Sequence, residues 1–222
     1  MYCRRMGVHG HLAGVSLEVI LRIRSARFET TGGFLFTHRG YSGPAVLDAS
    51  HLAIRSPAND PARLSVQWGD SEEVWEARLT GRGGGTVGSV VRRELPERLV
   101  AQLLSEAEVD PAIPLHQLTR EARRAVVRAL TDYPLPWTGD EGYKKAEVTG
   151  GGVSLAEVHP RTLESRRCPG LYFVGEVLDA FGPIGGHNFL WAWATGRAGG
   201  VAAGSPVREV GEGEEGASAA RL

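Results

Sequence analysis

Cysteine is scarce in this 222-residue sequence, which contains only Cys3 and Cys168. Two cysteines so far apart form neither the spacing of a metal site nor a disulfide framework. The sequence also lacks a run of about 18 apolar residues, so no transmembrane helix is expected. The basic residues at 4 and 5 are not followed by the apolar segment of a secretory signal. We therefore expect a cytoplasmic protein with reduced thiols and no membrane partner.

An excess of charge of one sign is missing as well. Lysine and arginine number 25, aspartate and glutamate number 26, and the formal net charge is -1. This balance offers no electrostatic argument for a polyanionic partner, so we expect no nucleic-acid binding. The seven histidines are scattered, without the i, i+4 spacing or the neighbouring cysteine of a metal site, so no metal is expected.

The first two thirds of the chain have the pattern of an α+β domain, with strands first and helices later. Apolar residues alternate with polar ones from Val15 to Ile23, which is typical of a half-buried strand. Ser42 is expected to cap a helix that has Pro44 in its first turn. Further strands are expected at 33–38 and 64–68, and further helices at 70–79, 99–107 and 119–130.

The pattern changes after Trp137. A short strand is expected at 146–149, before three glycines at 150–152. The continuous apolar run 171–174 predicts a strand that is covered on both faces. A Gly-acid turn and a Gly-Gly loop follow, and then a helix over 188–203 that is apolar nearly all round and expected to be buried. The acidic tail 205–222 is expected to be disordered.

Two stretches match the dinucleotide-binding pattern G-x-G-x-x-G. The first, Gly83, Gly85 and Gly88, follows a charged segment that is better interpreted as a helix than as the buried strand the motif needs. The second lies in the acidic tail, where carboxylates would repel a pyrophosphate. We therefore expect neither match to bind phosphate.

The segment from Gly170 to Ala194 has the order strand, Gly-acid turn, Gly-Gly loop and helix. Glu176 or Asp179 can accept hydrogen bonds from a ribityl or ribose hydroxyl at the strand's carboxyl edge. Gly185 and Gly186 would let the backbone pass under a planar ring. The amides that open the following helix would suit the partly anionic edge of a reduced flavin. A plain glycine-rich turn with surface acids is the alternative that these residues leave open.

Several motifs in the same order resemble the HI0933-like family of NAD(P)/FAD-dependent oxidoreductases. The similarity runs from about Leu12 to Gly204. The motifs in the C-terminal part are Thr149–Val153, Pro160–Ser165, Pro169–Asp179 and Gly185–Asn188. Those nearer the start are Leu12–Ser16, Phe34–His38 and Ser42–Ala45.

The resemblance implies an FAD-binding domain that is split by an inserted domain. Residues 1–145 would be the insertion, a β-barrel-like unit with helices, and 146–204 the C-terminal part of the Rossmann-like FAD-binding domain. FAD would be the cofactor, with NAD(P)H as one electron donor and a small organic molecule as substrate. The residues expected at the cofactor are Gly151, Gly152, Gly175, Glu176, Asp179, Gly185, Gly186, His187, Asn188 and Phe189.

The sequence departs from the family pattern in two places. Only residues 1–10 precede the similar region, so the family's N-terminal phosphate-binding segment is not seen, and His187 stands where the family has an aromatic residue. The resemblance thus implies half of a cofactor site, which needs a separate N-terminal half as partner. A cofactor-free remnant or interaction module is the alternative, and no side chain is assigned as a catalytic acid or base.

Overall fold

The computed structural model describes residues 9–80 and 84–205. The chain divides into two compact units, each described by itself below. The first comprises the chain up to residue 147 together with 183–185, and the second comprises 148–182 and the chain from 186 onward. Part of the expected tail, residues 206–222, lies outside the described residues. The expected division into an inserted domain and a returning FAD-binding segment stays a prediction.

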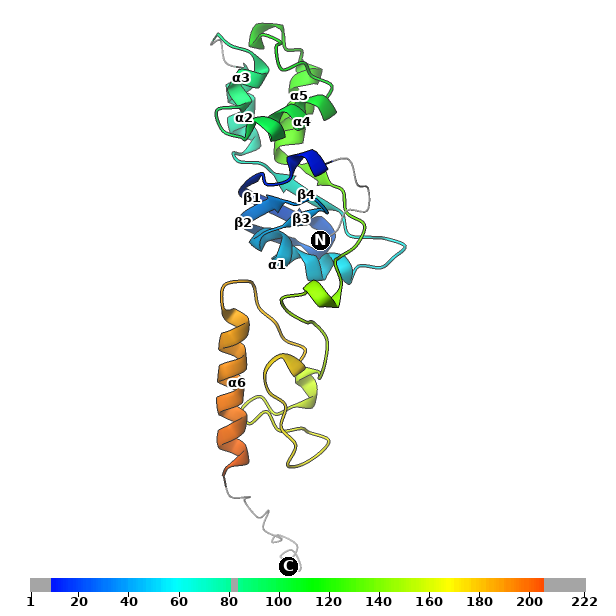
Figure 1. Ribbon diagram of the computed structural model, residues 1–222, viewed down its shortest axis with the longest axis vertical. Helices are drawn as coiled ribbons and strands as arrows, with labels where there is room; N and C mark the ends of the chain where they lie inside the picture. Colours follow the sequence, from blue (N-terminus) through cyan, green and yellow to red (C-terminus); the bar gives the residue numbers. More distant parts are fainter. Residues whose placement is uncertain (1–8, 81–83, 206–222) are drawn as a thin grey trace, which may run out of the picture. The chain divides into compact units, whose positions relative to one another are not determined.

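The first unit is built on a five-stranded antiparallel sheet with the strand order β3-β2-β1-β4-β5 (Figure 1). The expected alternation is confirmed in β1, where Val19, Leu21 and Ile23 are buried. The strands are β1 (Ser16–Ile23), β2 (Phe28–Phe36), β3 (Tyr41–Ser42), β4 (Leu64–Gln67) and β5 (Tyr133–Leu135).

Helix α1 (Pro44–Ile54) packs against β1 and β2. Pro44 begins it as expected, but the predicted cap at Ser42 is wrong, because Ser42 pairs with Leu35 in the sheet and Gly43 is the N-cap. Gly43 has a φ of 98°, and a Cβ there would lie 2.5 Å from the carbonyl oxygen of Gly33. Only glycine fits this close approach between the helix start and β2.

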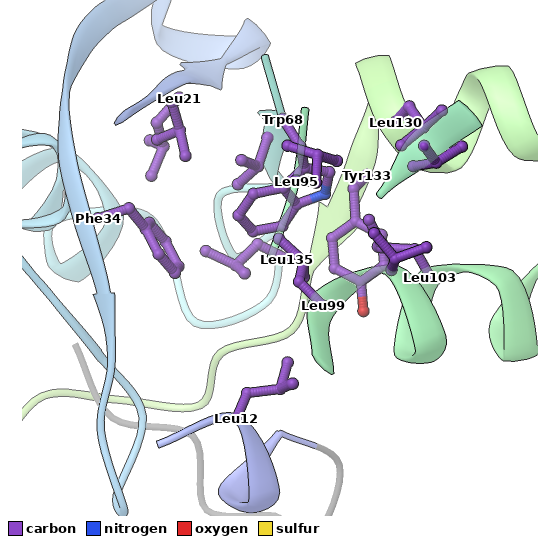
Figure 2. Close-up of a cluster of buried hydrophobic side chains, with 14 of the residues drawn as sticks. Leu12, Leu21, Phe34, Trp68, Leu95, Leu99, Leu103, Leu130, Tyr133 and Leu135 are labelled. Carbon is purple, nitrogen blue, oxygen red and sulfur yellow. The ribbon is translucent and has the colours of Figure 1, made fainter. Parts of the chain in front are cut away.

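Four more helices form a cluster in the same unit: α2 (Glu72–Thr80), α3 (Val87–Val91), α4 (Glu97–Glu106) and α5 (Arg120–Thr131). Thr119 caps α5 as predicted, and its Oγ1 accepts a hydrogen bond from the Ala122 amide at 3.1 Å. Leu99 and Leu103 of α4 and Leu130 of α5 meet Trp68 and Tyr133 in one buried cluster (Figure 2). The helices and the sheet therefore share a hydrophobic core.

A buried histidine joins the two edges of the sheet. His9 Nδ1 lies 2.8 Å from the hydroxyl of Tyr41 in β3, and Nε2 lies 2.8 Å from the hydroxyl of Tyr133 in β5. Because β3 and β5 are opposite edge strands, one imidazole can reach both only if the sheet is strongly curled. The expected mixture of α and β structure is confirmed, and the curled sheet is the closest counterpart of the expected barrel-like unit.

The second unit has one long helix, α6 (His187–Ala203), and extended segments joined by isolated bridges. Its buried core consists of Val158, Leu163 and Leu178, against which Trp191 of α6 packs. The bridges pair Val153 with Leu178, Val158 with Ser165, and Glu164 with Tyr172.

Three expectations for this unit are wrong. Residues 146–149 are bends and coil rather than a strand. In the run 171–174 only Tyr172 makes a bridge, and Leu171 and Val174 are exposed, because the described part of this unit has no sheet to cover them. Helix α6 forms where expected, but it is not buried.

The contacts of α6 explain its exposure. The side chains of Phe189, Leu190, Trp193 and Val201 are between 62% and 71% exposed. The helix meets the rest of its unit through a narrow strip that includes Thr195 and Gly199. A Cβ at Gly199 would lie 2.7 Å from Val174 Cγ1, so glycine lets the helix approach closely there. Among the described helices, none combines the length and apolar character that crossing a bilayer requires.

Candidate functional site

The two acids of the Gly-acid turn hold a neighbouring backbone segment. A carboxylate oxygen of Glu176 accepts the amide of Thr149, and Asp179 Oδ1 accepts the amide of Gly151 at 2.9 Å. The main chain adds two bonds between the same segments, from the Val153 amide to the Val177 oxygen at 2.9 Å and from the Asp179 amide to the Val153 oxygen at 2.8 Å. The acids therefore fix the glycine segment 149–153 onto the turn that begins at Gly175.

Gly151 and Gly152 have different surroundings. Gly152 has a φ of 113°, and a Cβ there would lie 2.3 Å from the Val177 oxygen, so it is packed directly on the turn. Gly151 has a φ of 95°, and no heavy atom lies within 4 Å of where its Cβ would be. Gly151 thus presents open backbone, while Gly152 supplies the close approach that keeps the segment in place.

Gly175 is held beneath α6 by hydrogen bonds. Its amide donates to Thr195 Oγ1 at 2.9 Å, and its oxygen accepts the Trp191 Nε1–H at 3.2 Å. Thr195 Oγ1 in turn donates to the Trp191 carbonyl oxygen at 2.7 Å. Gly175 is buried, and these bonds fix the position of the turn beneath α6.

The amino end of α6 is organised by Asn188. The Gly182 amide donates to Asn188 Oδ1 at 2.8 Å, and Asn188 Nδ2 donates to the Gly182 oxygen at 3.1 Å. Gly186, the N-cap, has a φ of 92° and no side chain with which to cap the helix. The amides of His187, Asn188 and Phe189 come before the first intrahelical bond, which Leu190 makes to Gly186. Amides in this position are typical anion ligands.

The predicted residues thus form two groups within the second unit. Gly151, Gly152, Glu176 and Asp179 are joined by the bonds around the turn, with Gly175 beneath α6. Gly186, His187, Asn188 and Phe189 open α6. Gly185 belongs to the segment 183–185 of the first unit, where the Ile184 amide donates to Asp48 Oδ1 at 2.9 Å.

Sequence reasoning missed four residues of this arrangement: Thr149, Gly182, Trp191 and Thr195. Thr195 had a usable signal, because it is a hydroxyl residue four positions after Trp191 in an otherwise apolar helix. A polar group on such a helix usually has a hydrogen-bond partner. Nothing in the sequence near Thr149 indicates that its amide is bound by an acid 27 residues later. No group of metal-ligating side chains occurs in the described ranges.

Comparison with known proteins places this arrangement in a family. The sequence model of the HI0933-like protein Rossmann domain matches residues 29–202. The chain therefore belongs to the HI0933-like family of flavoprotein oxidoreductases, as its motifs predicted.

Three curated relatives match most of this chain. It is 36% identical over 184 residues to the ribosomal RNA dihydrouridine synthase of Escherichia coli (strain K12), covering 83% of this chain and 45% of the relative. The Haemophilus influenzae enzyme of the same name is 34% identical over 191 residues, 84% of this chain and 46% of the relative. The 3-dehydro-bile acid delta(4,6)-reductase of Clostridium scindens is 40% identical over 187 residues, 81% of this chain and 46% of the relative.

These relatives show how much of a family member the chain covers, and they correct the expectation about nucleic acid. The chain spans about half the length of the relatives it matches. The expected absence of a nucleic-acid partner is contradicted, because two relatives are named for ribosomal RNA. The expectation rested on net charge, which averages over the whole chain, whereas nucleic acid is bound by local groups of basic residues.

Proposed function

We propose that this chain forms the flavin-ring side of an FAD-dependent oxidoreductase that reduces a carbon–carbon double bond conjugated to a carbonyl group. The shared chemistry of the relatives carries this proposal. Dihydrouridine is uridine whose ring double bond, next to a carbonyl, has gained two hydrogens. A delta(4,6)-reductase of a 3-dehydro bile acid acts on double bonds conjugated to the 3-oxo group. Relatives with different substrates therefore share one type of reduction.

The second unit fits the flavin through its backbone. The open backbone at Gly151 can lie against a flat ring, and the amides of His187, Asn188 and Phe189 can donate to its partly anionic edge. FAD, when bound, supplies the hydride. Glu176 and Asp179 act as positioning residues, because both carboxylates already hold the glycine segment.

For the substrate we propose a uridine in ribosomal RNA, as the names of the Escherichia coli and Haemophilus influenzae relatives suggest. The second candidate is a small conjugated ketone, favoured by the 40% identity to the bile acid reductase. NADH or NADPH would supply the electrons in either case.

The exposed apolar face of α6, formed by Phe189, Leu190, Trp193 and Val201, is where we propose that the phosphate-binding half of the FAD domain packs. Apolar patches of this kind mark interaction surfaces. The relatives, which are about twice as long as the matched region, contain enough additional chain to supply that half. Tight FAD binding would then require both halves, because the first glycine-rich loop of such a domain holds the pyrophosphate.

The test is reconstitution. The chain is purified alone and after co-expression with the phosphate-binding segment of the Escherichia coli relative, and FAD binding is followed by visible absorbance. We expect flavin to co-purify with the pair, and the reduced pair to convert uridine to dihydrouridine in ribosomal RNA, as measured by mass spectrometry of nucleosides. Reduction of a 3-oxo-Δ4 steroid instead would favour the second substrate, and no flavin in either preparation would reject the proposal.

A single-site variant tests the cofactor geometry. Asn188→Ala removes the side chain that holds the loop before α6 through its two hydrogen bonds to Gly182. The FAD affinity of the assembled pair should therefore fall about tenfold, which corresponds to the net contribution of about one hydrogen bond. Asn59→Ala, an exposed loop residue of the first unit, is the matched control. Equal affinities for the two variants would remove Asn188 from the proposed site.

A further inference from the structure

The solvent face of α5 carries a stripe of arginines. The exposed residues of this helix are Arg120, Glu121, Arg124 and Arg128, while Val126, Val127 and Leu130 are buried in the core. The three arginines are four residues apart, so each lies about 6 Å further along the helix than the one before. We call Arg120, Arg124 and Arg128 the arginine stripe.

Arginines beside the stripe are paired, whereas those of the stripe are not. Arg123, turned toward α2, binds Glu76 with an Nε–Oε2 distance of 2.8 Å. At the carboxyl end of α5, Asp132 is neutralised by Arg24 at 2.8 Å. In the described part of the chain the side chains of the stripe make no hydrogen bond or ion pair, and Glu121 is the one acid on the same face of α5. The face therefore keeps an excess of positive charge.

This arrangement of arginines lowers the stability of α5. Arg120 and Arg124, like Arg124 and Arg128, are like charges at i, i+4, and such pairs destabilise a helix. Arg120 is also the first residue of α5, where the helix dipole disfavours a cation. A solvated helix face usually mixes charges of both signs at this spacing. A bound polyanion would relieve both unfavourable interactions.

We propose that the arginine stripe binds the sugar–phosphate backbone of the RNA substrate. The inference rests on the ribosomal RNA substrate proposed above, and it assigns to the first unit the contact with that RNA. Arginine suits the task because its guanidinium donates two parallel hydrogen bonds to a phosphate. Contacts of this kind fix the position of the RNA without reading its sequence. The stripe would thus hold the RNA, and the uridine would be selected elsewhere.

The test measures binding of a fluorescently labelled RNA hairpin from Escherichia coli ribosomal RNA to the full chain at several salt concentrations. The variant R120Q/R124Q/R128Q should bind at least tenfold more weakly. The slope of log affinity against log salt should shrink by about 2 to 3, since three phosphate contacts are lost. The variant R63Q/R161Q/R197Q removes the same charge from exposed positions outside the stripe, and it should change the affinity less than twofold.

Further measurements separate the effect of the stripe on RNA binding from effects on folding and from the proposed chemistry. Circular dichroism should show the same helix content in all variants, because the stripe is exposed. Three lysines in place of the stripe should restore most of the salt dependence. Equal weakening by both triple variants, no RNA binding by the natural chain, or stripe-dependent binding of polyglutamate as tight as that of RNA would overturn the inference. If stripe-dependent RNA binding persists while the reconstituted pair binds no flavin, the proposed chemistry falls and the stripe stands.

Discussion

Gly151 and Gly152 are adjacent residues with similar backbone conformations and very different surroundings. Both have a positive φ, so alanine at either position should cost about 1 kcal/mol in backbone strain. Only at Gly152 does the added Cβ overlap another atom, the Val177 oxygen at 2.3 Å. We therefore expect Gly152→Ala to destabilise the second unit by at least about 2 kcal/mol more than Gly151→Ala, in line with the cost of overpacking.

Hydrogen exchange followed by mass spectrometry over residues 148–182 measures this difference. Gly139→Ala is a useful control in the first unit, because nothing lies within 4 Å of its Cβ position and its φ is not positive. Equal exchange rates in the two glycine variants would show that the segment 149–153 does not pack on the turn in solution.

His9 predicts how the stability of the first unit depends on pH. Burial lowers the pKa of His9, and the nearby Glu106 carboxylate, 3.5 Å away, raises it by less. His11 also lowers this pKa, and the hydroxyls of Tyr41 and Tyr133 face the two ring nitrogens. Because the folded pKa lies below the unfolded value of 6.5, the unfolded chain takes up the proton first as the pH falls.

The stabilisation from neutral His9 should therefore be complete above pH 6.5 and decrease below it, by at most about 1.4 kcal/mol for each pH unit. Urea unfolding between pH 8 and pH 5, followed by hydrogen exchange of peptides from residues 9–147, measures this dependence in the first unit. In His9→Gln the contribution of this residue disappears, so the profile should be flatter in this range. A steeper loss of stability in His9→Gln than in the natural chain would contradict the assignment.

For the candidate site, the sequence was sufficient to predict several of the residues that take part but not which partners they bind. The glycines, Glu176 and Asp179 could be selected in advance, because a Gly-acid turn before an apolar helix is a local pattern. Their roles could not, since Asp179 binds the Gly151 amide 28 residues earlier in the chain. A carboxylate that could accept from a ligand accepts equally well from a backbone amide, and only the fold decides which donor is near.

At the scale of elements, α6 has two tryptophans with opposite surroundings. Trp191 packs on the core of Val158, Leu163 and Leu178 and donates to the Gly175 oxygen, whereas Trp193 is 71% exposed. We expect Trp191→Gln to destabilise the second unit by about 2 to 4 kcal/mol, as other losses of packed aromatic side chains do. Trp193→Gln should leave its stability within about 0.5 kcal/mol and reduce self-association.

Denaturation and analytical ultracentrifugation of the two variants measure these effects. The same two variants also test the proposed packing surface, because Trp193→Gln should weaken assembly with the phosphate-binding half. If Trp193→Gln unfolds the second unit, the exposed face of α6 is part of that unit's own core, and no partner is needed to cover it.

Elements of the two units were predictable to different degrees for one physical reason. The strands of the first unit alternate between a buried face and an exposed one, and this period-two pattern is visible in the residues from 16 to 23. The run 171–174 is apolar throughout, which indicates burial but does not show which element of the structure covers it. In the described chain no second sheet covers this run, Leu171 and Val174 stay partly exposed, and only Tyr172 makes a bridge. The curl of the sheet was not visible in the strand residues themselves and was expected only from the family resemblance, since the contacts that reveal it join His9 to two tyrosines far along the chain.

At the scale of the whole molecule, the two units should differ in stability. The first has an extended core that includes Trp68, Trp75 and Phe34, whereas the buried apolar core of the second is formed by Val158, Leu163 and Leu178. Small cores give marginal stability. We therefore expect two unfolding transitions in urea, with the second unit unfolding first.

The order of the two transitions can be read by hydrogen exchange, which reports on 9–147 and 148–205 separately in the same sample. Co-expression with the phosphate-binding half and addition of FAD should then raise the urea midpoint of the second unit alone. A ligand that binds only the folded second unit stabilises it by about 2.7 kcal/mol at 100 times its dissociation constant. The transition of the first unit should be unchanged by FAD and should instead respond to the RNA hairpin through the arginine stripe. A single transition that FAD leaves unmoved would mean that the second unit is stable without a partner and that its open glycine backbone holds no flavin.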